Sequence, residues 1–259
     1  MSPAGGMIAA EVLKLRRHRS TMLTAGVLSI GITVLYFLVI ESRSNGQISA
    51  EKALSSGSAL LAMYFGSFTA VLIGTAAGTL DLADGVFRDL VATGRSRVAL
   101  FAVRVPAAVT VALTFNLVGF AVPVATAFAG GGVRLVLLAQ YAGWVVLATA
   151  VVTVVSVAVA SGTGSRSVTL IAVIGGQTIG TTLLFGAEFL GSLRQGLLSV
   201  ALSHLRPGPV VGSRDHPGSS NALPGFVLPM STAVAVLVLA AWVVVPLVIA
   251  VWRVRNQDA

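Results

Sequence analysis

The amino-acid sequence predicts an all-α integral membrane protein, a bundle of six transmembrane helices, and three observations carry this prediction. First, 56% of the 259 residues are hydrophobic and only 10% are charged, whereas about a quarter of the residues are charged in soluble domains. Second, six apolar runs reach roughly the 20 residues that a helix needs to cross the hydrocarbon layer. Third, basic residues gather at the ends of these runs. The chain, 1–259, is therefore expected to be a single transmembrane domain.

A separate amphipathic helix is predicted over residues 7–19, before the first span. Its polar face carries Glu11 and Lys14, and its basic end includes Arg16 and Arg17. Such a helix is typical of segments that lie along the membrane interface, with long basic side chains reaching the lipid phosphates. A simple topological anchor of positive charge is the alternative, and the residues leave both interpretations open.

The six spans follow from the apolar runs and are separated by short polar segments. They are predicted near 21–40, 58–80, 105–128, 135–160, 167–187 and 229–252. Pro123 and Pro246 are expected to kink their helices, which neighbouring helices can tolerate within a membrane. The first run exceeds a signal-peptide core, so it is expected to remain as a helix. Residues 188–228 are rich in Gly, Pro and Ser and predict external, interfacial or re-entrant short helices and a loop.

The basic residues also predict the orientation of the bundle. Eleven of the 17 Lys and Arg residues flank one side of the spans and six flank the other. By the positive-inside rule, the side with eleven, which carries both termini, is expected to be cytoplasmic. Abundant Arg, Ala, Val and Gly suggest a GC-rich bacterial genome, and hence a bacterial plasma (inner) membrane as the location of this multi-pass chain.

Small residues at four-residue spacing predict close helix packing in two spans. In the second and fifth spans these positions are Gly66, Ala70, Gly74, Gly78, Ala172, Gly176 and Gly180. Such stripes allow helix backbones to approach closely, either within one bundle or between subunits.

The predicted spans contain few polar side chains, and those near the middle of each span are uncharged. Ion-driven transporters usually place ionisable side chains there, so an ion-driven mechanism is disfavoured. Asn116, Gln177 and Thr181 are the candidates for lining a pathway, although such amides more often join helices by hydrogen bonds. The chain has no cysteine and only three scattered histidines, so no metal site is expected.

The segment 81–96, "DLADGVFRDLVATGRS", concentrates charge between the second and third spans. On a helix, Asp84 precedes Arg88 by four residues, the favourable orientation for an ion pair. Such an exposed pair contributes only a few tenths of a kcal/mol, so stability alone hardly explains it. Two interpretations stay open, a solvated loop that sets topology and a short helix that docks a soluble partner. The candidate docking residues are Asp81, Asp84, Phe87, Arg88, Asp89 and Leu90.

At these residues the sequence resembles the six-span permease subunits of ATP-binding-cassette (ABC) exporters of the second type, which include drug and antibiotic exporters. The stretch "AEVLKLRRHRSTML" is similar to the opening helix of that family, with Glu11, Lys14 and Arg17. The stretch "GTLDLADGVFRDLVATGRSRVALFAVR" is similar to its cytoplasmic hinge. Asp81 stands where the family usually has Glu, and Arg104 stands where Lys is common.

The resemblance implies a division of labour between chains. Two six-span permease subunits, as a homodimer or heterodimer, would enclose the pathway for a hydrophobic or amphipathic drug, antibiotic, peptide or lipid. Separate cytoplasmic ATPase subunits, two in the family, would bind ATP and Mg and push on a coupling helix at 81–96. Lys14 and Lys52 do not lie in a phosphate-binding loop, so no ATP site, cofactor or enzyme activity is expected on this chain.

Two other classes of function are compatible with the residues. A non-transporting membrane anchor could recruit an ATPase through the same docking segment. A lipid-modifying enzyme is suggested by "DLADG", the start of a metal-binding motif of phosphatidyl-alcohol transferases, but Arg88 and Asp89 depart from that motif. No nucleic-acid partner is expected, because the basic residues flank the spans and do not form a soluble basic domain.

Overall fold

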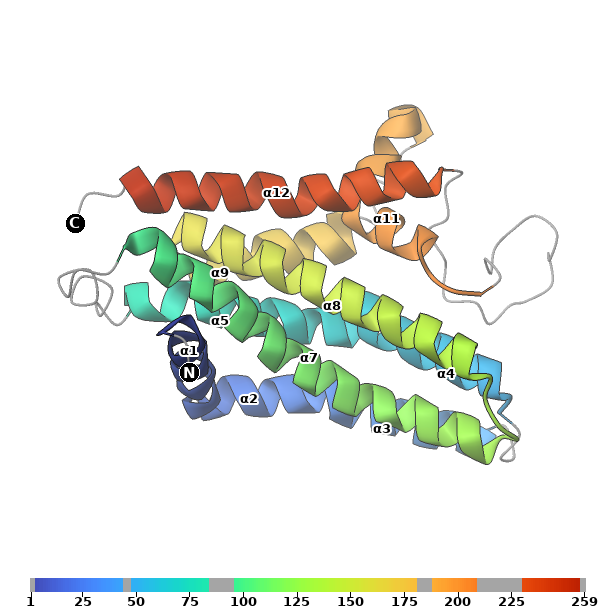
Figure 1. Ribbon diagram of the computed structural model, residues 1–259. Helices are drawn as coiled ribbons and strands as arrows, with labels where there is room; N and C mark the ends of the chain where they lie inside the picture. The colour runs from blue at the N-terminus through green and yellow to red at the C-terminus, as the bar shows by residue number, and fades with distance from the viewer. Residues whose placement is uncertain (1–2, 44–47, 84–95, 181–187, 209–229, 257–259) are drawn as a thin grey trace.

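A computed structural model describes residues 3–43, 48–83, 96–180, 188–208 and 230–256, and within these ranges the chain is helical with no β-strand (Figure 1). Five helical runs are long and apolar enough to cross a membrane. The predicted all-α, multi-pass membrane protein is thus confirmed in this general form. The sixth span stays a prediction.

The N-terminal region consists of a separate helix and the first candidate span. Helix α1 covers Pro3–Arg17 and runs crosswise to the spanning helices at one end of the bundle (Figure 1). His18 interrupts the helix with φ −76° and ψ 77°. The chain then continues through α2 (Arg19–Gly26), the π-helical stretch η1 (Val27–Gly31) and α3 (Ile32–Arg43). The expected amphipathic helix is therefore separate from the first span.

The second span is longer than its apolar run predicts. It comprises α4 (Ala50–Ala59), the π-helical stretch η2 (Leu60–Tyr64) and α5 (Phe65–Ala83). The hydroxyl of Ser49 caps the start by accepting a hydrogen bond from the Lys52 amide at 3.4 Å. The helix thus begins well before residue 58 and includes Asp81 in its last turn.

The third and fourth spans are continuous helices that form an antiparallel pair. Helix α7 covers Arg97–Ala129 and begins at the Ser96 cap, whose hydroxyl accepts from the Ala99 amide at 3.1 Å. Helix α8 covers Leu135–Thr163 and ends at Gly164, whose φ of 68° lies in the left-handed region that glycine tolerates.

The C-terminal part contains shorter elements and the last span. Helix α9 (Arg166–Leu170) and the π-helical η3 (Ile171–Gly180) cover most of the predicted fifth span, and the rest of that span lies outside the described residues. The short helices η4 (Glu188–Gly196) and α11 (Leu198–His204) occupy part of the predicted external segment. Helix α12 covers Thr232–Asn256 and corresponds to the last predicted span.

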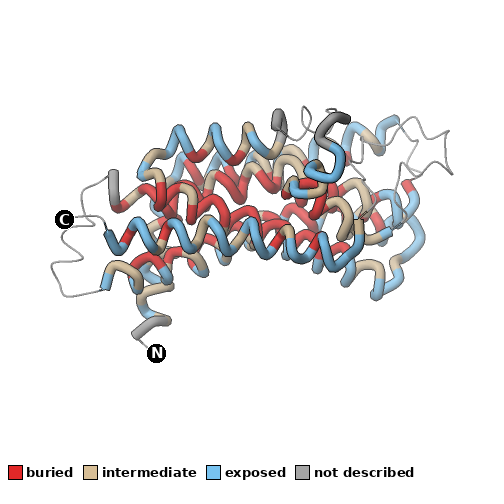
Figure 2. Tube along the Cα trace, turned by 90° about the horizontal axis from the view of Figure 1, so that it is seen from above, coloured by how far each residue is buried: buried red, intermediate tan, exposed pale blue. Residues whose placement is uncertain are grey.

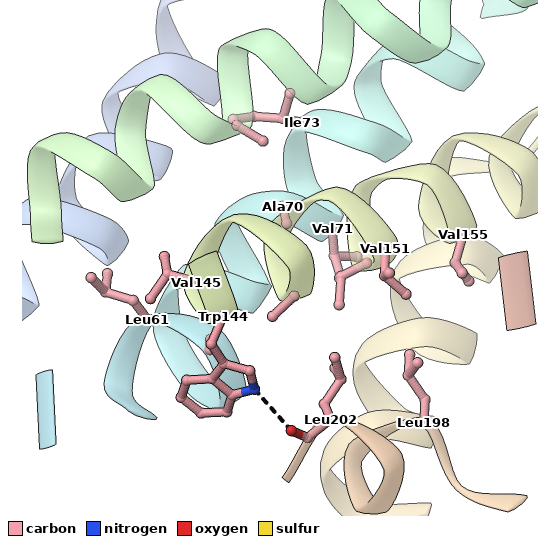
Figure 3. Close-up of a cluster of buried hydrophobic side chains, with 14 of the residues drawn as sticks. Leu61, Ala70, Val71, Ile73, Trp144, Val145, Val151, Val155, Leu198 and Leu202 are labelled. Atoms are coloured by element: carbon pink, nitrogen blue, oxygen red, sulfur yellow. Dashed lines mark hydrogen bonds between the residues drawn. The ribbon is translucent and has the colours of Figure 1, made fainter. Parts of the chain in front are cut away.

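Helices α5 and α8 form the centre of the bundle. In the second and fourth spans 72% of the most apolar window is buried, against 22% in the first span and 17% in α12. Figure 2 shows the buried residues along the middle and the exposed ones on the outer helices. The core includes Val71 of α5 and Val151 and Val155 of α8, with Leu198 and Leu202 of α11 beside them (Figure 3).

Helix α1 and the end of α12 lie at one end of the bundle, beside the end of α5 and the start of α7 (Figure 1). The predicted even number of crossings requires this arrangement. Which side of the membrane this end faces stays a prediction.

Candidate functional site

A buried cluster of opposite charges joins three helices at the end of the bundle where α1 lies. Asp81, near the end of α5, accepts hydrogen bonds from Lys14 of α1 and from Arg104 of α7. The Arg104 Nη2 to Asp81 Oδ2 distance is 2.5 Å, and Lys14 Nζ also lies 3.6 Å from Glu11 Oε2. Two acidic and two basic residues thus balance one another formally.

The depth of this cluster distinguishes it from a surface ion pair. The side chain of Asp81 is only 2% exposed and that of Arg104 only 3%, whereas Lys14 at 30% reaches solvent. An ion removed from water loses several kcal/mol of hydration, which partners must offset. Arg104 lies about two turns inside α7, so its charge lies within the helical bundle and not at the start of the helix. Each member therefore depends on the others.

The cluster borders the predicted docking segment on both sides. Asp81 is the first residue of the segment and Arg104 follows the segment on the return helix α7, while α1 packs against both α5 and α7. The predicted docking residues Asp84, Phe87, Arg88, Asp89 and Leu90 lie outside the described residues. Asp81 itself is buried against α1 and α7, so its carboxylate belongs to this helix junction.

The predicted interfacial residues take different roles. Glu11 and Lys14 join the cluster, whereas Arg17, in the last turn of α1, is exposed. The sequence identified Asp81, Lys14 and Arg104 as notable residues, but it predicted a local pair between Asp84 and Arg88. It missed the contact between Lys14 and Asp81, which are 67 positions apart.

Asn116 forms a second polar centre, around the middle of the bundle. Its Nδ2 donates to the Gly66 carbonyl at 3.0 Å and to Thr149 Oγ1 at 2.8 Å. Its Oδ1 accepts from Ser29 Oγ at 2.8 Å, and the side chain is fully buried. One amide thereby joins four spans, as the interhelical interpretation expects. Its two donors are already used, so a cargo contact would have to compete with these bonds.

We expect Asn116→Leu to lower the free energy of unfolding by about 1–3 kcal/mol, because buried partners lose their hydrogen bonds. Unfolding of the purified full chain in detergent, titrated with sodium dodecyl sulfate, measures this change. Thr126→Val is the matched control on the same helix, since the Thr126 hydroxyl donates to the Val122 carbonyl of that helix and joins no other described helix. Equal stability of the two variants would contradict the joining role.

Gln177 differs from Asn116 in its surroundings. Its side-chain amide atoms are buried and form no hydrogen bond with the residues that the structure describes. The third pathway candidate, Thr181, lies outside the described residues. Pathway lining by Asn116, Gln177 and Thr181 therefore stays a prediction.

In the small-residue stripe of the second span, Gly74 and Gly78 face α8 within the chain. A Cβ added to Gly74 would lie 2.8 Å from the Ser156 Cβ, and one added to Gly78 would lie 2.5 Å from the Ala160 Cβ. Ala70, between Gly66 and Gly74, is fully buried. These contacts correspond to packing within the bundle.

The stripe of the fifth span behaves differently. A Cβ added to Gly176 would meet no atom within 4 Å, and Ala172 is exposed. The last member, Gly180, ends η3. This face is therefore uncovered by the described part of the chain, which keeps the subunit-interface interpretation open there.

A further group at the opposite end of the bundle was not anticipated from the sequence. The Nη2 of Arg206, just after α11, donates to Ser55 Oγ at 2.5 Å, and its guanidinium lies 5.9 Å from the ring centre of Trp144. Trp144 Nε1 donates to the Leu202 carbonyl at 2.8 Å (Figure 3). Burial lowers the pKa of the Arg206 guanidinium, an effect that Tyr141 opposes. This group fastens α11 to α4 and α8.

Comparison with known proteins adds no family assignment. No protein-family model matches the sequence, and no curated protein matches it significantly. The functional interpretation therefore depends on the helix arrangement, the charge cluster and the resemblance described above.

Proposed function

We propose that this chain is the permease subunit of an ABC transporter of the second type, which exports a hydrophobic or amphipathic compound. ATP binding and hydrolysis occur on separate cytoplasmic subunits, and two permease chains enclose the pathway. The observation that carries the proposal is the charge cluster of Lys14, Asp81 and Arg104, because it connects the start of the predicted docking segment to α1 and to the helix that follows the segment.

The cluster supports a mechanical role for the segment 81–96. A force applied by a partner between α5 and α7 reaches Asp81 on one side and Arg104 on the other. Because both charges are buried and paired, separating them is costly, so the helix ends and α1 move together. Such a unit transmits motion to the spans better than a loop that flexes independently.

The Asp81 carboxylate also bears on the lipid-modifying alternative. Both of its oxygens accept hydrogen bonds from cationic side chains. A divalent metal would have to displace Lys14 and Arg104 before this carboxylate could coordinate it. This arrangement favours the mechanical role of Asp81 over metal-assisted phosphoryl chemistry.

We expect the double substitution Phe87→Ala with Arg88→Ala to abolish cargo-stimulated ATPase activity of the reconstituted complex. The reason is that the proposed apolar and basic contacts of the docking segment with the ATPase would be removed. The readouts are ATPase activity and ATP-dependent accumulation of a fluorescent amphipathic dye in proteoliposomes. Arg255→Gln, at the end of α12, removes a charge at the same end of the bundle and is the control.

Each outcome of this experiment decides between classes of function. Dye transport by the unaltered complex that is lost in the double variant supports a coupled permease. A bound ATPase without any flux supports a non-transporting anchor. Full coupling in the double variant, or failure of any ATPase to co-purify, contradicts the proposal.

A further inference from the structure

An amphipathic cleft lies beside the turn that links the interfacial helix to the first span. It has a volume of about 500 Å³ and lies between α1, α2 and α7, within the range of small-molecule sites. Its apolar lining comes from Val12, Met22, Val111 and Phe115. Among the described lining residues, Arg16 is the one with a charged side chain.

The hydroxyl groups in the cleft are already used by the protein. Thr110 Oγ1 donates to the Pro106 carbonyl and Thr114 Oγ1 donates to the Thr110 carbonyl, each at 2.8 Å. Both threonines therefore present mainly their methyl groups to an occupant. The cleft offers an apolar body and one cationic group, with little further hydrogen bonding.

The two ends of the cleft lie at different depths in the proposed membrane. Arg16 belongs to α1, which lies crosswise at the end of the spans (Figure 1). Phe115 lies eleven residues beyond Arg104 on α7, or about 16 Å farther along the helix axis. The cleft thus extends from the level of lipid headgroups towards the level of acyl chains.

The charge of Arg16 is not neutralised by any described residue. Arg16 is exposed and forms no hydrogen bond or ion pair in the described part of the chain. The neighbouring Arg17 and Arg19 are exposed too, so the local potential is positive. A net negative headgroup gains from this potential, whereas a zwitterionic headgroup brings its own cation.

We infer that this cleft binds one anionic phospholipid, with its phosphate at Arg16 and an acyl chain along Met22, Val111 and Phe115. The bound lipid fills the space between α1 and the first and third spans. It thereby fixes the interfacial helix against the bundle. This site does not depend on the proposed transport activity.

Native mass spectrometry of the purified full-length chain, titrated with phosphatidylglycerol or phosphatidylcholine, tests the site. We expect a first phosphatidylglycerol to bind more tightly than phosphatidylcholine. Arg16→Gln should weaken that first binding step about fivefold, the effect of one basic residue near an anionic surface. Arg255→Gln removes the same charge elsewhere at this end and should leave the step unchanged.

Two further measurements separate a lipid site from diffuse attraction. Thr114→Trp fills the cleft without altering its charge and should also weaken the first phosphatidylglycerol step. Phosphatidylglycerol with a photoreactive acyl chain should label residues 110–115. Equal effects of Arg16→Gln and Arg255→Gln, equal binding of both lipids, or labelling confined to other helices would overturn the site. Competition by glycerophosphate as strong as by the lipid would show a phosphate site and also overturn it.

Discussion

Asp81→Asn is expected to lower the free energy of unfolding by about 3–5 kcal/mol, the loss found when one partner of a buried ion pair is removed. The substitution preserves the size of the side chain but removes its charge. Arg104, only 3% exposed, then remains as a cation inside the bundle, and Lys14 loses its buried partner. Unfolding of the purified full chain, titrated with sodium dodecyl sulfate, measures the change.

A second variant separates the loss of charge balance from the loss of helix packing. In Asp81→Leu with Arg104→Met, both buried charges are replaced by apolar groups of similar length. Such replacements of whole ion pairs are often neutral or stabilising, so we expect this double variant to be more stable than Asp81→Asn. Lys14 can turn towards solvent, since it is already 30% exposed.

The control for this series is Glu51→Gln, an exposed carboxylate in the first turn of α4. It should change the stability by less than about 1 kcal/mol, the scale of a charge near a helix terminus. If Asp81→Asn were as mild as Glu51→Gln, the cluster would be no more than a surface feature. The proposed mechanical unit would then lose its basis.

Gly78→Ala is expected to destabilise the protein by about 1–3 kcal/mol through overpacking between α5 and α8. The added Cβ would lie 2.5 Å from the Ala160 Cβ and 3.0 Å from the Val157 carbonyl oxygen. Both neighbours belong to α8, whose backbone cannot move aside as a flexible side chain could. The two central helices must therefore separate locally, which the same unfolding measurement detects.

Gly143→Ala provides the matched control for this prediction. Gly143 lies on α8 itself, but an added Cβ there meets no atom within 4 Å. Because alanine favours the helix over glycine by up to about 1 kcal/mol, the control should be neutral or slightly stabilising. Equal destabilisation by both substitutions would show that the space at Gly78 does not limit packing.

The sequence predicts the helical architecture well because apolar length and composition are local properties. It places the last span close to α12 and the fourth close to α8. It places the start of the second span too late, because "AEKALSSG" reads as polar. The structure begins the helix there at the Ser49 cap, whose hydroxyl accepts a hydrogen bond from the Lys52 amide at 3.4 Å. The Ser56 hydroxyl is satisfied within the helix, because it donates to the Lys52 carbonyl at 2.6 Å.

The candidate site is less predictable from the sequence, for a physical reason. Helical periodicity shows which residues share a face but not which helix covers that face. Asp81 and Arg104 are 23 positions apart and Asp81 and Lys14 are 67 apart. A signal was nevertheless present, because Asp81 follows Gly78 by three residues, next to the closely packed stripe.

For Asn116, too, the sequence predicts the place of the residue in its helix but not its partners on other helices. The sequence correctly identifies it as a rare amide in an apolar span, and offers both a pathway and an interhelical role. Only the structure shows Ser29, Gly66 and Thr149 around it. The partners could not be predicted, because hydroxyl groups are common in these spans and a backbone carbonyl has no sequence signature.

The π-helical stretches Val27–Gly31 and Leu60–Tyr64 have a consequence for how the protein can deform. A wider turn interrupts the regular ladder of backbone hydrogen bonds, and helices bend most readily at such points. The first stretch contains Ser29, and the second ends two residues before Gly66. Because Asn116 forms hydrogen bonds with both residues, both π-helical stretches lie next to its amide. The halves of the first two spans that lie away from the charge cluster, α3 and α4, can therefore bend relative to the rest of the bundle. The cluster of Lys14, Asp81 and Arg104 stays intact during this motion.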